Sequence, residues 1–152
     1  MSTLTCELTI EAPPEIVYSF FTDPERFREW QGQEAWLDPR PGGMFRVRMT
    51  GVSNAIVSGE YVELVPFERI VYTWGWENAQ IVQGAIDVPP GSSRVEVTLT
   101  PSGEGTHLRL RHSGLPSDAA MSFHKFGWDH SLARLAIAGA GGDPGPDMLA
   151  AM

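Results

Sequence analysis

The sequence predicts an α+β fold in which a curved antiparallel sheet is covered by one long C-terminal helix. The first observation behind this prediction is a series of short segments with alternating apolar and polar residues, joined by short turns, which favours an antiparallel meander. The second is the run Ser117–Ala138, the longest helix-like stretch of the chain. A helix with an apolar stripe needs a surface to cover, so we expect it to close the sheet, with a cavity between them.

The C-terminal helix is predicted from its periodicity and from its two ends. At 100° per residue, the apolar stripe lies within about 40° of one direction and consists of Met121, Trp128, Leu132 and Leu135. Ser117 can cap the first turn, and Asp118 lies next to the positive end of the helix. The glycines that follow, beginning at Gly139, are typical of a helix end.

The N-terminal part predicts one strand followed by two short helices. Thr3–Ile10 alternates apolar and polar residues, as expected for a half-buried strand. After a proline break, Glu15–Thr22 and Pro24–Trp30 read as helices. Gln31–Gly43 holds two prolines and two glycines and is expected to form a loop.

The middle of the chain predicts the rest of the sheet. The strands expected there are Met44–Thr50, Ile56–Val65, Arg69–Trp76, Ser93–Leu99 and Thr106–Ser113. Ile81–Val88 reads as either a strand or an extended loop. We therefore expect one domain over residues 1–138 and a flexible, Gly- and Pro-rich tail over residues 139–152.

Composition limits the classes of partner. The chain has 152 residues, of which 42% are hydrophobic and 20% charged, as in an ordinary globular domain. Its net charge of −8 argues against a nucleic acid or an anionic membrane as partner, because both require a positive surface. With one cysteine, Cys6, and neither a signal peptide nor an apolar run long enough for insertion into a membrane, a cytoplasmic location is expected.

Several short motifs in this order resemble one known superfamily. They are Ile10–Tyr18, Thr22–Pro24 with Trp30, Gly42–Phe45, Gly59–Trp74, Val95–Pro101, Gly105–Leu108 and Gly127–Trp128. Together they resemble the helix-grip (START-like, SRPBCC) superfamily, and within it the branch named after the activator of Hsp90 ATPase. The resemblance implies six or seven antiparallel strands wrapped around the C-terminal helix, with two short helices closing one side. It also implies a cavity, since relatives bind lipids, hormones or polyketides there, and some catalyse cyclisation or hydrolysis.

The aromatic residues are the strongest indication of a ligand site. Tyr72, Trp74 and Trp76 alternate on one strand, and Trp30 and Trp128 approach from helices. We expect the binding residues to be Trp30, Phe45, Tyr72, Trp74, Trp76, Val97, Leu110, His112, His124, Trp128, Ser131, Leu132 and Leu135. The alternative is that the rings fill the core, that His112 is a hydrogen-bonded core histidine, and that His124 lies on the helix surface.

Three functions follow in order of preference. The first is binding of a small hydrophobic or amphipathic molecule without catalysis, oriented by Tyr72, His112 and Ser131. The second is a cyclase or hydrolase with His112 or His124 as general base. The third is a module that binds a chaperone through its outer surface. No metal site and no cofactor are expected, because neither a ligand cluster nor a nucleotide motif is present.

The C-terminal helix also has a second apolar stripe, on the side away from Trp128. It consists of Phe123, Phe126 and Ile137. This stripe either packs under the Gln31–Gly43 loop or forms a homodimer surface.

Overall fold

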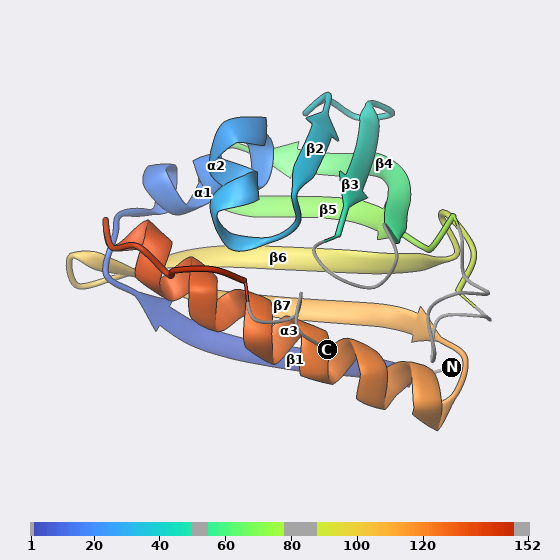
Figure 1. Ribbon diagram of the computed structural model, residues 1–152. Helices are drawn as coiled ribbons and strands as arrows, with labels where there is room; N and C mark the ends of the chain where they lie inside the picture. Colours follow the sequence, from blue (N-terminus) through green and yellow to red (C-terminus); the bar gives the residue numbers. More distant parts are fainter. Residues whose placement is uncertain (1, 50–54, 78–87, 148–152) are drawn as a thin grey trace.

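The computed structural model describes residues 2–49, 55–77 and 88–147, and these form one antiparallel sheet with three helices (Figure 1). The strands are β1 Ser2–Ile10, β2 Glu34–Leu37, β3 Met44–Arg48, β4 Ile56–Val65, β5 Arg69–Trp74, β6 Ser93–Ser102 and β7 Gly105–Leu115. The helices are α1 Pro14–Thr22, α2 Pro24–Trp30 and α3 Asp118–Gly139. The strand order is β1-β7-β6-β5-β4-β3-β2, so β2 to β7 form a meander and β1 returns beside β7. Figure 1 shows α3 lying across β1 and β7, with α2 beside β2 and α1 beside α2.

The predicted α+β fold is confirmed, and one element was missed. The stretch Gln31–Gly43 was expected to be a loop, but its residues Glu34–Leu37 form the edge strand β2, which pairs with β3. These four residues are all half-buried and show no alternation, so nothing in their pattern distinguishes them from a loop. Ile81–Val88, predicted as strand or extended loop, lies outside the described residues except for Val88.

Helix α3 begins where the sequence predicts. The hydroxyl of Ser117 accepts a hydrogen bond from the backbone N–H of Ala120 at 3.1 Å, which confirms the expected N-cap. Trp128, Leu132 and Leu135 are buried, and Met121 is half-buried. The apolar stripe of α3 therefore faces the sheet, and it forms one wall of the protein interior.

The inner face of the sheet supplies the opposite wall. Val97 of β6 pairs in register with Leu110 of β7, and both are fully buried. Cys6 of β1 is also buried, opposite Leu110, so it behaves as a small apolar core residue. Alternation along each strand thus sets a continuous apolar surface against α3.

Two glycines predict opposite effects of the same substitution. A Cβ at Gly59 of β4 would lie 2.1 Å from the carbonyl oxygen of Thr73, whereas a Cβ at Gly127 of α3 would meet nothing within 4 Å. We expect Gly59→Ala to lower the free energy of unfolding by about 2 kcal/mol through overpacking. Gly127→Ala should raise it by about 0.5–1 kcal/mol, because alanine favours a helix. Urea denaturation measures the change in the free energy of unfolding for both variants. A change of the same sign in the two would contradict the close packing around Gly59.

Candidate functional site

An aromatic cluster lies between the sheet and α3. Tyr72 and Trp74 are two residues apart on β5 and both point inward. The ring of Phe45 from β3 stacks on Tyr72 at 4.1 Å between centroids, and the ring of Trp128 from α3 lies 5.2 Å from that of Trp74. Rings from the sheet and from the helix are therefore in direct contact.

Trp76 extends this cluster beyond the end of β5. It forms an isolated bridge with Val57, and its ring lies 5.9 Å from that of Trp74. Its other ring contacts are with Phe123 at 5.7 Å and His124 at 6.2 Å, both on α3. Tyr72, Trp74 and Trp76 are thus all buried on the inner side, as predicted, although Trp76 lies beyond the end of β5.

His112 of β7 is fully buried and hydrogen-bonded at both ring nitrogens. Its Nδ1 accepts a hydrogen bond from Nε1 of Trp128 at 3.0 Å, so the proton of the neutral ring is on Nε2. Nε2 lies 2.8 Å from Oγ of Ser93, and the Ser93 hydroxyl in turn donates to the carbonyl oxygen of Trp74 at 2.8 Å. Both ring nitrogens of His112 therefore form hydrogen bonds within the protein itself.

His124 of α3 is held in the opposite tautomer. Its Nδ1 lies 2.7 Å from the carbonyl oxygen of Ala120, which can only accept, so Nδ1 carries the proton. Its Nε2 then accepts a hydrogen bond from Nε1 of Trp76 at 3.2 Å. His124 is buried, not on the helix surface, and its ring centroid lies 5.0 Å from that of His112.

Burial keeps both imidazoles neutral. It lowers the pKa of His112 well below 6.5, and the neighbouring His124 lowers it further. Burial also lowers the pKa of His124 to about 4, although the hydrogen bond to Ala120 opposes this shift. Since each unprotonated nitrogen already accepts an indole N–H, neither ring presents a free lone pair to a bound molecule.

Three other buried polar atoms have no hydrogen-bond partner among the described residues. They are the hydroxyl of Tyr72, Nε1 of Trp74 and Oε1 of Gln31. The Gln31 amide donates through Nε2 to Oγ of Ser131 at 3.4 Å, so its carbonyl end is the one left over. Burial raises the pKa of Tyr72 well above 10, which keeps its hydroxyl protonated and able to donate. Two further buried nitrogens, Nε of Arg48 and Nε of Arg134, also lack a hydrogen-bond partner among the described residues, and both belong to half-buried arginines.

Trp30 lies in the same core cluster as the other predicted site residues, on the side formed by α1 and α2, where the ring of Phe27 separates it from Phe45. Its ring is 5.1 Å from that of Phe21 and 5.0 Å from that of Phe27, and its Nε1 donates to the carbonyl oxygen of Phe20 at 2.8 Å. Trp30 therefore belongs to the packing between α1 and α2, and its contact with a ligand stays a prediction. The other predicted site residues, which are Val97, Leu110, Ser131, Leu132 and Leu135, are buried around the aromatic cluster.

Sequence reasoning missed two polar residues of this interior. Ser93 begins β6 and was read only as the start of a strand, yet its hydroxyl links His112 to Trp74. Gln31 directly follows α2 and was read as part of a loop, yet only 5% of it is exposed. A long polar side chain next to a buried tryptophan was the available signal for Gln31.

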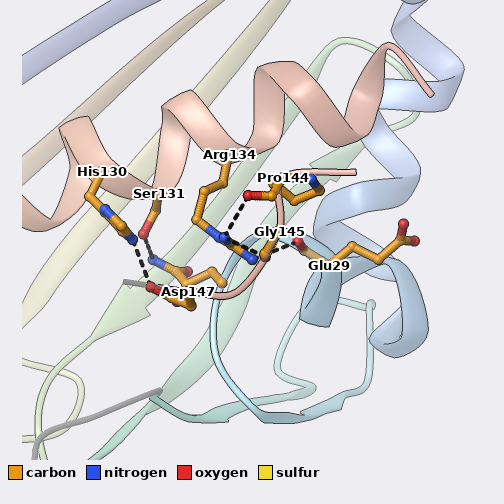
Figure 2. Close-up of polar contacts among 8 residues, drawn as sticks. Glu29, His130, Ser131, Arg134, Pro144, Gly145 and Asp147 are labelled. Carbon is orange, nitrogen blue, oxygen red and sulfur yellow. Dashed lines mark hydrogen bonds and ion pairs between the residues drawn. The ribbon is translucent and has the colours of Figure 1, made fainter. Parts of the chain in front are cut away.

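The segment after α3 folds back along that helix, as Figure 2 shows. Nε2 of His130 lies 2.7 Å from Oδ1 of Asp147, and Arg134 donates to the carbonyl oxygen of Gly145 at 3.0 Å. Arg134 of α3 also donates to the backbone oxygen of Glu29 in α2 at 3.4 Å, so one side chain contacts both the segment and α2. A surface pocket of about 320 Å³ lies here, lined by Arg28, Glu29, Arg134, Gly142, Asp143, Pro144 and Gly145. The predicted flexibility of the tail stays a prediction.

The second apolar stripe of α3 is divided in the structure. Phe123 packs its ring 5.1 Å from that of His124, whereas Phe126 and Ile137 are 52% and 47% exposed. The homodimer expected at this face stays a prediction. Within the described part of the chain, no group of three or more potential metal ligands occurs. No helix there has the length and apolarity that crossing a membrane requires.

Comparisons with known proteins agree with this architecture. The family described as "Activator of Hsp90 ATPase homolog 1-like protein" matches residues 11–139. The solution structure of an AHSA1-like protein from Rhizobium etli is 42% identical, with a TM-score of 0.72, over 96% of this chain and 86% of that chain. The crystal structure of protein CV1439 from Chromobacterium violaceum is 29% identical, with a TM-score of 0.75, over 91% of this chain and 96% of that chain.

A third solved structure shares the fold at lower identity. It is described as an HSP90 activator from Plasmodium falciparum and is 22% identical, with a TM-score of 0.72, over 91% of this chain and 96% of that chain. No curated protein gives a match. Since the family match spans most of the sequence, from the end of β1 to the end of α3, the chain belongs to the Activator of Hsp90 ATPase homolog 1-like family, within the helix-grip superfamily.

Proposed function

We propose that this protein binds a small, mainly apolar molecule between its sheet and α3, and that it acts by binding and not by catalysis. The observation that carries the proposal is the set of unpartnered polar atoms on Tyr72, Trp74 and Gln31, inside a mainly aromatic and aliphatic interior. Ligand sites in proteins are typically apolar with a few polar groups that fix orientation.

The cost of burying these polar atoms without partners favours a ligand that pairs with them. Each buried polar group without a hydrogen bond costs about 1–3 kcal/mol, so folded proteins keep few of them. A ligand that bonds to these groups removes that cost, and its apolar surface adds about 25 cal/mol per Å² before the costs of binding. The polar atoms that are costly without a partner therefore favour the binding of a ligand that supplies one.

The hydrogen bonds of the two histidines favour binding over catalysis. A general base needs a lone pair within reach of the proton it removes. In this protein, the lone pair of His112 accepts from Trp128 and that of His124 accepts from Trp76. Each imidazole would have to lose an indole partner before it could act as a base.

The proposal is tested by adding bulk to the two faces of α3. Leu132 faces the interior and Phe126 faces outward, so Leu132→Trp should obstruct the site whereas Phe126→Trp should not. With the neutral dye Nile red, we expect saturable binding to the unmodified protein and to Phe126→Trp, and at least tenfold weaker binding to Leu132→Trp. Circular dichroism checks that both variants fold. Native mass spectrometry of the purified protein, searched for a co-purified small molecule, gives an independent readout.

Two results would contradict the proposal. If Leu132→Trp folds and binds the dye as tightly as the unmodified protein, the interior is not the site. If binding is lost only in Phe126→Trp, the outer face of α3 is the binding surface, as a protein-interaction module of the chaperone-binding kind would require.

A further inference from the structure

The aromatic cluster between the sheet and α3 holds three tryptophans, but only two of their indole N–H groups have an acceptor in the described part of the chain. The indole N–H groups of Trp76 and Trp128 are donated to His124 and His112, at 3.2 Å and 3.0 Å. Trp74 lies among the same rings, 5.6 Å from His112 and 6.2 Å from His124 between centroids, yet its N–H has no partner among the described residues. An indole nitrogen can only donate, so Trp74 requires an acceptor that the surrounding side chains do not supply.

The second observation concerns charge. The buried polar residues in the described part of the chain are Gln31, Ser93, Thr106, His112, His124 and Ser131. None of these is an aspartate, glutamate, lysine or arginine, and the two imidazoles are neutral. A buried carboxylate or ammonium group of a ligand would therefore lack an opposite charge, which costs several kcal/mol.

We infer that the ligand is uncharged and carries a hydrogen-bond acceptor, such as the carbonyl oxygen of a ketone or ester, that receives the indole N–H of Trp74. This inference rests on the proposed binding function and specifies its ligand class. It separates that class from fatty acids and other anionic lipids, because no lysine or arginine is among the buried residues of the described part. The guanidinium groups of the half-buried Arg48 and Arg134 already bind Glu34 and backbone oxygens. It also separates it from plain hydrocarbons, which would leave the N–H of Trp74 unpaired.

The other two unpartnered atoms extend the same pattern. The Tyr72 hydroxyl stands two residues before Trp74 on the same face of β5 and can donate to a second acceptor. Oε1 of Gln31 can only accept, so it suits a hydroxyl or amide N–H of the ligand. The interior is thus matched to a neutral, oxygenated, ring-containing molecule, since aromatic rings pack against Tyr72 and Trp74.

Three probes with one ring system test this inference. 2-Acetylnaphthalene carries a neutral acceptor, 2-ethylnaphthalene carries none, and 2-naphthoate carries a negative charge. We expect the dissociation constant of the ketone, measured by isothermal titration calorimetry, to be about tenfold lower than that of the ethyl compound, the value of one good hydrogen bond. The carboxylate should bind at least tenfold more weakly than the ketone.

Substitution of Trp74 shows whether its N–H is responsible. Trp74→Phe keeps an aromatic ring but removes the donor, so it should abolish the preference for the ketone and leave binding of the ethyl compound within about threefold. Trp36→Phe, at a half-buried tryptophan of the edge strand β2, is the matched control and should keep the preference. Tyr72→Phe removes a hydroxyl assigned to a second acceptor, which the ketone lacks, so it should keep the preference. If Trp74→Phe does not fold, a downfield shift of the Trp74 indole N–H resonance with the ketone, but not with the ethyl compound, provides the second test.

The outcomes separate the inference from the proposed function. Equal affinity for the ketone and the ethyl compound, or tight binding of the carboxylate, would overturn the inference while interior binding stands. A ketone preference that survives in a folded Trp74→Phe variant would also overturn it. If none of the three naphthalenes binds and Nile red does not bind either, the proposed function itself fails.

Discussion

Lowering the pH from 7 to 4 is expected to reduce the free energy of unfolding by about 3 kcal/mol through His124 alone. The pKa of this imidazole is about 4 in the folded protein, against 6.5 ordinarily. Between these values the unfolded chain binds a proton that the folded chain does not. The stability contributed by the neutral ring is therefore complete above pH 6.5 and is lost as the pH falls toward 4.

The neighbouring His112 should steepen this loss. Its pKa is also lowered, by burial and by His124, so the unfolded chain gains a second proton over the same pH range. In the folded state a proton on Nε2 of His124 would also displace the N–H of Trp76, and a proton on Nδ1 of His112 would displace that of Trp128. Urea denaturation at pH 7.5, 6.5, 5.5 and 4.5 measures how steeply the free energy of unfolding falls with pH.

Matched substitutions assign the slope to the buried ring. His124→Gln keeps an acceptor within reach of Trp76 but cannot titrate, so it should flatten the decline between pH 6.5 and 4.5. His107 is a histidine of the sheet surface paired with Glu7 at 3.0 Å, and His107→Gln should leave most of the slope in place. Identical slopes for the unmodified protein and His124→Gln would show that carboxylates, and not this imidazole, cause the loss.

The alternation of the strands made much of this interior predictable. His112 follows Leu108 and Leu110 at every second position of β7, so its inward direction could be read directly from the sequence. The same holds for Tyr72 and Trp74 on β5 and for Trp128 on α3, because a period of two or of 3.6 residues determines which side faces the core. Fold and wall residues thus follow from local periodicity.

The hydrogen-bond pairing inside the cluster could not be predicted in the same way. Which indole reaches which imidazole depends on where β5, β7 and α3 cross, and these elements are far apart in the sequence. The hydroxyl of Ser93 and the amide of Gln31 acquire their roles only once such non-local contacts exist. Strand β2 was missed for a related reason, since an edge strand is defined by its pairing with β3 and not by its own pattern.

Removing the ring of Trp128 is expected to be the most destabilising single change in the cluster. Trp128 is 1% exposed, contacts the rings of Trp74 and His112 and donates its N–H to His112. Trp128→Ala should lower the free energy of unfolding by about 3–5 kcal/mol through the cavity it leaves. Phe126→Ala, two residues earlier on the exposed face of α3, should change it by no more than about 0.5 kcal/mol.

Trp128→Phe then separates the hydrogen bond from the packing. It keeps an aromatic ring against Trp74 but leaves Nδ1 of His112 without a donor, at a cost of about 1–3 kcal/mol. This cost should shrink at low pH, because a protonated Nδ1 no longer needs a donor, whereas the cost of Trp128→Ala should persist. Urea denaturation of both variants at pH 7.5 and 4.5 measures the difference. A Trp128→Phe cost that does not depend on pH would mean that the indole contributes only its volume, and that its hydrogen bond to His112 does not stabilise the neutral ring.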